Sequence, residues 1–83
     1  MMNWRKVESS QIAEVGYELE TEILGIRFKA TKRYPASEYH YSFVPQDVHA
    51  ALLTAESVGK YFTEHIKQQP DLYPYRKIEP VEA

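Results

Sequence analysis

Aromatic and basic residues gather in the middle of the chain, and their chemistry is that of a nucleic-acid-binding surface. Tyr39 and Tyr41 stand at alternate positions, and Phe43 continues the pattern. Such rings stack on nucleobases, while lysine and arginine side chains hold phosphates. The nearest cations in the sequence are Arg27, Lys29, Lys32 and Arg33. A nucleic-acid-binding site is therefore the strongest functional candidate that these residue types indicate.

Other residues could extend this surface, and a simpler interpretation stands beside it. His40 faces away from the two tyrosines by strand alternation. Arg76 and Lys77 join the basic patch only if the C-terminal segment folds back onto it. In the simpler interpretation Tyr39, Tyr41 and Phe43 are the core face of a small sheet, and the cations are solvated. Function then lies beside the core, where the basic loop meets the face that carries His40.

The remaining residue types argue against catalysis and metal binding. The chain has no cysteine, and its three histidines lack the i, i+4 spacing of a helical metal site. No general base or oxyanion loop can be assigned to Ser9 or Ser10. A chain of 83 residues is also short for a deep catalytic cavity. We therefore expect a non-catalytic binding module, not an enzyme, without cofactor or metal.

Composition and charge indicate one ordinary globular domain over residues 1–83. Hydrophobic residues make up 43% and charged residues 27% of the chain, which is near the norm. A net charge of −2 argues against tight non-specific binding to nucleic acid. No segment approaches the ~20 apolar residues of a membrane helix, and the N-terminus lacks a signal-peptide core. We expect a cytoplasmic monomer that does not bind membranes.

Alternating apolar residues predict three strands that position these groups. The first strand turns Val15, Tyr17 and Leu19 inward, and Ile12 is out of phase with them. Together with Gly16, this predicts a bulge or a close backbone approach. The second strand spans residues 22–30, and the turn 20–22 joins the two. The third strand begins near residue 38, after a basic loop that contains a proline.

Helical spacing follows the third strand. Pro45 favours a first helix that ends near residue 55, and Ser57 can cap a second. The inward stripe of the second helix is Tyr61, Phe62, His65 and Ile66. Residues 73–78 are predicted to lie extended across the body, and residues 1–6 and 79–83 to be flexible. The predicted fold is α+β, a three-stranded antiparallel meander covered by two C-terminal helices, with an extended C-terminal segment.

Several short motifs carry a resemblance to a known family. They are Val7-Glu8-Ser9-Ser10-Gln11-Ile12, Val15-Gly16-Tyr17, Tyr39-His40-Tyr41, Val44-Pro45, Ser57-Val58-Gly59-Lys60-Tyr61-Phe62 and Tyr73-Pro74-Tyr75-Arg76. In this order the chain resembles the KTSC domain family over residues 7–78. That family comprises short bacterial domains found alone or at the C-terminus of some lysyl-tRNA synthetases. The resemblance implies a role that is unknown, with RNA binding suggested by the synthetase association.

This chain also departs from the family pattern. The segment between Phe28 and Tyr39 is longer than the usual turn, and Glu18 stands where aspartate is usual. The basic loop could therefore belong to this chain alone. The alternative function is a protein–protein interaction module that uses the tyrosine-rich surface.

Overall fold

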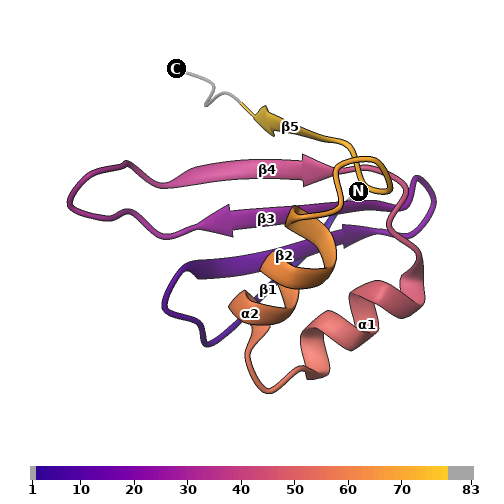
Figure 1. Ribbon diagram of the computed structural model, residues 1–83, viewed down its shortest axis with the longest axis horizontal. Coiled ribbons are helices and arrows are strands. Elements are labelled where there is room, and N and C mark those ends of the chain that lie inside the picture. The colour runs from indigo at the N-terminus through magenta and orange to yellow at the C-terminus, as the bar shows by residue number, and fades with distance from the viewer. Residues whose placement is uncertain (1, 79–83) are drawn as a thin grey trace.

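The computed structural model describes residues 2–78 as one antiparallel sheet with helices on one face (Figure 1). Strand order follows the sequence, β1-β2-β3-β4-β5, so every strand pairs with its chain neighbour. The strands are β1 (Asn3–Lys6), β2 (Ile12–Glu18), β3 (Ile23–Phe28), β4 (Ser37–Tyr41) and β5 (Tyr75–Ile78). The helices are α1 (Gln46–Thr54), α2 (Val58–Phe62) and the π-helical turn η1 (Thr63–Lys67).

The α+β class is confirmed, but the predicted number of strands was too small. Residues 3–6 form β1, where the sequence predicted a flexible arm, and residues 75–78 form β5. Both strands have four residues and lie at the sheet edges, so neither shows the alternation of a half-buried strand. The predicted flexible tail at 79–83 lies outside the described residues.

The central strands follow the sequence pattern except at their ends. The pairing of β2 with β3 shifts register between Ile12 and Glu14, which confirms the predicted bulge. Leu19 and Phe43 were predicted to face inward, and both are largely exposed. The physical reason is that β2 ends at Glu18 and β4 ends at Tyr41, so the alternation of side chains stops before it reaches them.

The helices cover the sheet through their apolar positions. Pro45 is the N-cap residue of α1, and the Ser57 side chain accepts a hydrogen bond from the Lys60 amide at 3.2 Å. This confirms the predicted cap. Phe62 and Ile66 point inward as predicted, whereas His65 is exposed and lies tilted against Tyr61, with 4.4 Å between the ring centroids. The π-helical turn at Thr63–Lys67 changes the helical phase there, so His65 leaves the inward stripe.

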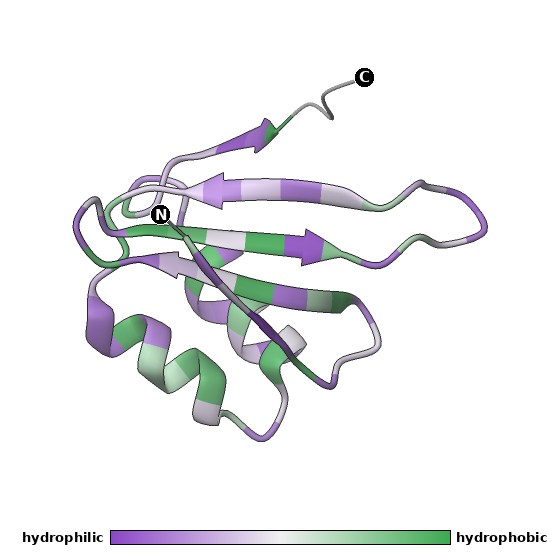
Figure 2. Ribbon diagram, turned by 180° about the vertical axis from the view of Figure 1, so that it is seen from behind, coloured by the Kyte–Doolittle hydropathy of each residue, from purple (hydrophilic) through white to green (hydrophobic). Residues whose placement is uncertain are grey.

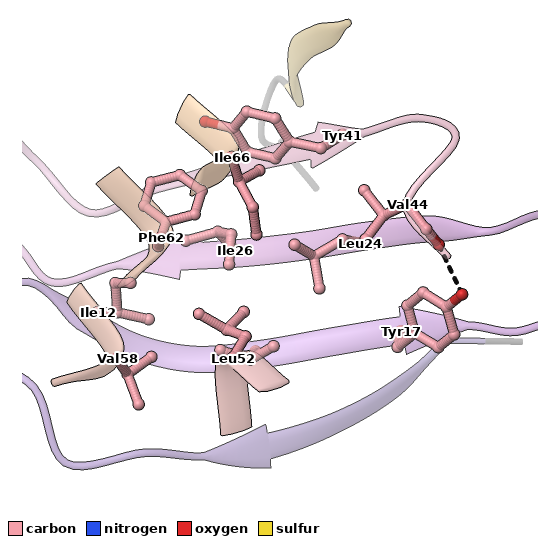
Figure 3. Packing of buried hydrophobic residues seen from close by; sticks show 11 residues of the cluster. Ile12, Tyr17, Leu24, Ile26, Tyr41, Val44, Leu52, Val58, Phe62 and Ile66 are labelled. Atoms are coloured by element: carbon pink, nitrogen blue, oxygen red, sulfur yellow. Dashed lines mark hydrogen bonds between the residues drawn. The ribbon is translucent and has the colours of Figure 1, made fainter. Parts of the chain in front are cut away.

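The core lies between the sheet and the helices (Figure 3). Its members share nearly complete burial: Ile12, Val15, Tyr17, Leu24, Ile26, Tyr41, Val44, Leu52, Val58, Phe62 and Ile66. The buried hydroxyl of Tyr17 donates a hydrogen bond to the Val44 carbonyl at 2.6 Å. Burial is the main reason that the pKa of Tyr17 is raised, and the negative charges of Glu22 and Asp47 raise it further. The hydroxyl therefore keeps the proton that this bond needs.

His49 is a half-buried histidine of α1 that stacks on the Tyr17 ring at 4.4 Å. Burial, and then the nearby charge of Arg5, lower its pKa below the ordinary value. The unfolded chain therefore binds a proton at His49 more readily than the folded chain does. We expect the free energy of unfolding to fall as pH drops below about 6.5, and to stop falling once pH is below the folded-state pKa.

This pH dependence is measured by denaturant titration of the wild type and of His49→Gln between about pH 5 and 7.5, the range in which histidine titrates. The His49→Gln variant is expected to lose part of the slope. The exposed His65→Gln variant is the matched control and keeps it. An identical slope in wild type and His49→Gln contradicts the assignment.

On the face of the sheet opposite the helices, Gly16 of β2 lies beside Gly25 of β3, and we call these two residues the glycine floor. Cross-strand register places Trp4, Gly16, Gly25, His40 and Arg76 in one row across the five strands. In Figure 2, which views this face, β1 runs obliquely in front of the neighbouring strands. A Cβ at Gly16 would lie 2.7 Å from the Trp4 ring. What approaches Gly16 closely is therefore the Trp4 side chain and not another backbone segment, and Trp4 pins the N-terminal segment to the sheet.

Gly25→Ala is expected to displace this tryptophan. The added Cβ would lie 2.6 Å from atoms of both Trp4 and Met2, and overpacking of this kind costs about 1–3 kcal/mol. Trp4 is the single tryptophan of the chain, so its emission reports the change directly. We expect a red-shifted emission and a lower melting temperature. Gly59→Ala, far from this ring, is the control, and unchanged emission in Gly25→Ala contradicts the packing.

Candidate nucleic-acid interface

An open groove of about 810 Å³ lies on the helix face of the sheet, beside the β3–β4 loop. The residues that line it come from the sheet, the loops and the end of η1: Ser10, Gln11, Phe28, Lys29, Thr31, Tyr34, Pro35, Ser37, Tyr39, Tyr41, Lys67, Pro70 and Tyr75. Rings form much of its surface, and its charged side chains are two lysines. We call it the aromatic groove.

Three tyrosines from adjacent strands make the inner wall. Tyr75 of β5 lies 5.9 Å from Tyr39 and 5.7 Å from Tyr41 between ring centroids. Tyr75 is 57% exposed, Tyr39 is half-buried and Tyr41 is only 3% exposed. Tyr34 of the loop is 68% exposed and lines the groove as well. The rings open to a ligand are therefore Tyr75 and Tyr34, with part of Tyr39.

The stacking platform predicted at Tyr39, Tyr41 and Phe43 is corrected accordingly. Tyr41 is a core residue that packs edge-on against Phe62 at 5.2 Å, and burial raises its pKa. Phe43 lies outside the groove, because its backbone has already left β4. The simpler interpretation of these rings as core holds for Tyr41 and partly for Tyr39, and it is wrong for Phe43.

The cations divide between the two faces of the sheet. Lys29 and Lys67 line the groove, and the Lys29 ammonium donates to the Ser9 carbonyl at 2.6 Å. Lys77 stands opposite Tyr39 in the register of β4 and β5, so it projects from the same face. Lys32 and Arg33 are exposed in the loop next to the groove. Of the predicted basic residues, Lys29 lines the groove and Lys77 projects from the same face, while Lys32 and Arg33 lie beside it. The predicted patch therefore supplies only part of its positive charge to this site.

Arg27 is held on the opposite face by its neighbours. Its guanidinium lies 2.9 Å from Glu38 and 3.5 Å from Glu14, and 3.8 Å above the Trp4 ring. His40 contacts the same Glu38 carboxylate at 2.8 Å. Burial alone would raise the pKa of Glu38, but the hydrogen bonds from Arg27 and His40 outweigh it and lower that pKa.

The structure therefore does not bring every predicted site residue together. Arg27, His40 and Arg76 lie on the outer face, away from Lys29 and Tyr39. Three groove residues, Tyr34, Tyr75 and Lys67, were not predicted as site residues. The pairing of β5 with β4 places Tyr75 beside Tyr41, and only a sequence reading that recognised β5 as a strand could have found it.

A second, polar hollow of about 610 Å³ lies where the β1–β2 loop meets α2, and it contains both N-terminal serines. The Ser9 hydroxyl accepts hydrogen bonds from the amides of Gln11 and Ile12, both at 3.2 Å. Through these bonds Ser9 stabilises the turn at the entry to β2. Within residues 2–78 no group of three metal-ligating side chains converges, and no helix there is long and apolar enough to cross a membrane.

Known proteins are similar to this chain in sequence. The KTSC domain model matches residues 8–69. An uncharacterized protein of Stutzerimonas stutzeri is 34% identical over 73 residues, which cover 88% of this chain and 93% of the relative. A protein of Tsukamurella paurometabola is 38% identical over 61 residues, covering 74% of this chain and 84% of its own length.

A solved structure agrees with the sequence relatives. The crystal structure of a KTSC domain protein from Yersinia pestis superimposes with a TM-score of 0.79 and 30% identity. The superposition covers 95% of this chain and all of the other. With the family model matched over most of its length, the chain belongs to the KTSC domain family.

Proposed function

We propose that this KTSC domain is a non-catalytic module that binds single-stranded RNA in the aromatic groove. One observation carries the proposal: the exposed rings of Tyr75 and Tyr34 line the same groove as the ammonium groups of Lys29 and Lys67. Exposed rings offer stacking faces to unpaired bases, and the lysines offer positive charge to the phosphates between them.

The polar groups of the groove favour binding over catalysis. Among residues 2–78, its lining includes serine, threonine, glutamine and lysine side chains, but no carboxylate or histidine. A general acid–base pair needs a positioned group that titrates near the working pH, and this lining does not supply one. Such a groove suits recognition of a strand better than a reaction on it.

Single strands fit the groove better than duplexes do. Bases in a duplex are stacked on one another, whereas unpaired bases can turn their faces to protein rings. Few cations border the groove, so we expect modest affinity and a shallow salt dependence. Each neutralised phosphate of a single strand contributes about 0.7 to the slope of log affinity against log salt. Lys29, Lys67 and Lys77 together set a slope near −2.

Fluorescence anisotropy of a labelled single strand of about eight nucleotides, within the range of small binding modules, tests the proposal. The strand is titrated with protein from about 20 to 300 mM salt, which spans strong and weak screening of charge. A tRNA and a duplex of equal length are run beside it. We expect the single strand to bind better than the duplex, with the shallow slope given above. Absence of binding at the lowest salt contradicts the proposal.

Protein–protein interaction through the same tyrosine-rich surface is the second candidate function. The observation that favours it is the exposure of Tyr34 and Tyr75, because tyrosine is enriched at the cores of protein interfaces. Immobilised domain that retains one defined protein after nuclease treatment, and loses it on Tyr75→Ala, supports this candidate. A captured species that disappears with nuclease supports RNA.

A further inference from the structure

The two ends of the strands carry opposite surface chemistry. At one end the β3–β4 loop exposes Lys32, Arg33 and Tyr34, and we call these residues the basic tip. The other end contains the β2–β3 turn and the corner between β4 and α1. The two ends lie at opposite extremes of the longest dimension of the molecule, which measures 33 Å (Figure 1).

The opposite end combines apolar side chains with carboxylates. Leu19 and Phe43 are 58% and 68% exposed there, next to the exposed carboxylates of Glu20, Glu22 and Asp47. The Val44 amide donates to the Glu22 carbonyl at 2.9 Å and ties the turn to the corner. We call these five residues, Leu19, Glu20, Glu22, Phe43 and Asp47, the acidic end.

Phe43 is held in an unusual position on this end. Its φ angle is +62°, in the left-handed region that bulky residues rarely occupy. Its ring is directed to solvent while the flanking Tyr41 and Val44 are buried. Large apolar groups grouped on the surface of a small domain commonly mark a contact with another molecule.

The charges of the two ends are complementary. Residues 29–36 contain three cations and no carboxylate, and residues 19–22 and 42–47 contain carboxylates and no lysine or arginine. We propose that this chain associates with a second copy head to tail, with the basic tip of one molecule docked on the acidic end of the next. Tyr34 then packs against Phe43 and Leu19, while Lys32 and Arg33 meet the carboxylates.

This arrangement uses two different surfaces, so it is heterologous. Heterologous contacts that do not close into a ring propagate as open chains. Exposed ion pairs supply part of the attraction, and at about 0.1 M salt the interaction between exposed charges is largely screened beyond about 10 Å. The association is therefore weak, grows with concentration and falls with salt, which departs from the monomer expected from sequence alone.

Sedimentation equilibrium tests the proposal at low salt and up to about 1 mM protein, the weak end of protein affinities. We expect the weight-average mass of the wild type to rise with concentration beyond that of a dimer, and to return to that of a monomer at about 0.5 M salt, where the screening length is only a few ångströms. Phe43→Asn removes the acidic-end ring with a residue that tolerates the left-handed backbone. The Lys32→Glu/Arg33→Glu variant reverses the charge of the basic tip.

Mixing the two variants gives the decisive result. Each variant alone is expected to remain monomeric, because each chain lacks one of the two surfaces. An equal mixture is expected to form dimers and nothing larger, because each variant supplies the surface that the other lacks. Tyr75→Ala, altered only in the aromatic groove, is the control and associates like the wild type.

Two results overturn the proposal. One is a wild type that stays monomeric at low salt over the whole concentration range. The other is a mixture of the two variants that stays monomeric although each variant is folded, as judged by Trp4 emission. Both readouts are independent of RNA, so failure here leaves the groove proposal standing, and failure of RNA binding leaves this one standing.

Discussion

Replacing Phe62 with alanine is expected to lower the free energy of unfolding by about 3–5 kcal/mol. The ring is 2% exposed and belongs to the core, with edge contacts to Phe28 at 5.7 Å and to Tyr41 at 5.2 Å. Truncation leaves a cavity that the sheet cannot collapse into, because Phe28 and Tyr41 are fixed on neighbouring strands. Native domains have only about 5–15 kcal/mol in total, so this loss is a large share of the whole, and the variant is expected to unfold at a much lower denaturant concentration.

Denaturant titration followed by circular dichroism measures this loss. Phe43→Asn is the control, because the Phe43 ring is largely exposed and asparagine tolerates the left-handed backbone at this position, so no loss of stability is expected. Phe28→Ala is expected to fall between the two, since its ring is only partly buried at the edge of the core. If Phe62→Ala unfolds at the same denaturant concentration as the wild type, the packing face has been assigned wrongly.

Replacing Tyr75 with alanine is expected to weaken single-stranded RNA binding by about 5- to 140-fold. One base stacked on an aromatic ring is worth about 1–3 kcal/mol, and each 1.4 kcal/mol is a tenfold change in affinity. Tyr75 is an exposed ring of the groove wall, in contact with both Tyr39 and Tyr41. The anisotropy titration at low salt measures the loss.

Two variants separate stacking from other effects at this position. Tyr75→Phe keeps the ring and is expected to bind RNA nearly as well as the wild type. Phe43→Asn removes an even more exposed ring outside the groove and is expected to leave RNA affinity unchanged. Equal affinity of Tyr75→Ala and the wild type, with both proteins folded, removes Tyr75 from the binding site.

The sequence predicted the centre of the fold well, because alternation and capping are local signals. Val15, Tyr17, Leu24 and Ile26 are buried as their spacing indicates, and Ser57 caps α2. The edge strands were missed for a physical reason. β1 and β5 form strands because of contacts with the strands beside them. The Trp4 ring of β1 packs on the glycine floor, and Tyr75 of β5 lies beside Tyr41 of β4.

The candidate site was predicted less well than the fold, for a related reason. Sequence proximity grouped Arg27 with Lys29, but adjacent strand residues point to opposite faces, and Arg27 is paired with Glu38 on the outer face. Lys67 and Tyr75 lie far from Lys29 in the sequence and reach the groove only through the packing of η1 and β5. Residue types indicated what each side chain can bind, but which side chains meet in one site depends on tertiary structure.

The most direct test of the groove as an RNA site is a map of amide chemical shifts in the isotope-labelled domain as unlabelled single-stranded RNA is added. The predicted result is a set of shifts confined to the groove, with the largest changes at Lys29, Tyr34, Tyr39, Lys67 and Tyr75. The amide signals of residues whose side chains lie on the outer face, such as Glu14 and Arg27, are expected to keep their chemical shifts. Shifts centred on the outer face, or none at saturating RNA, contradict the account.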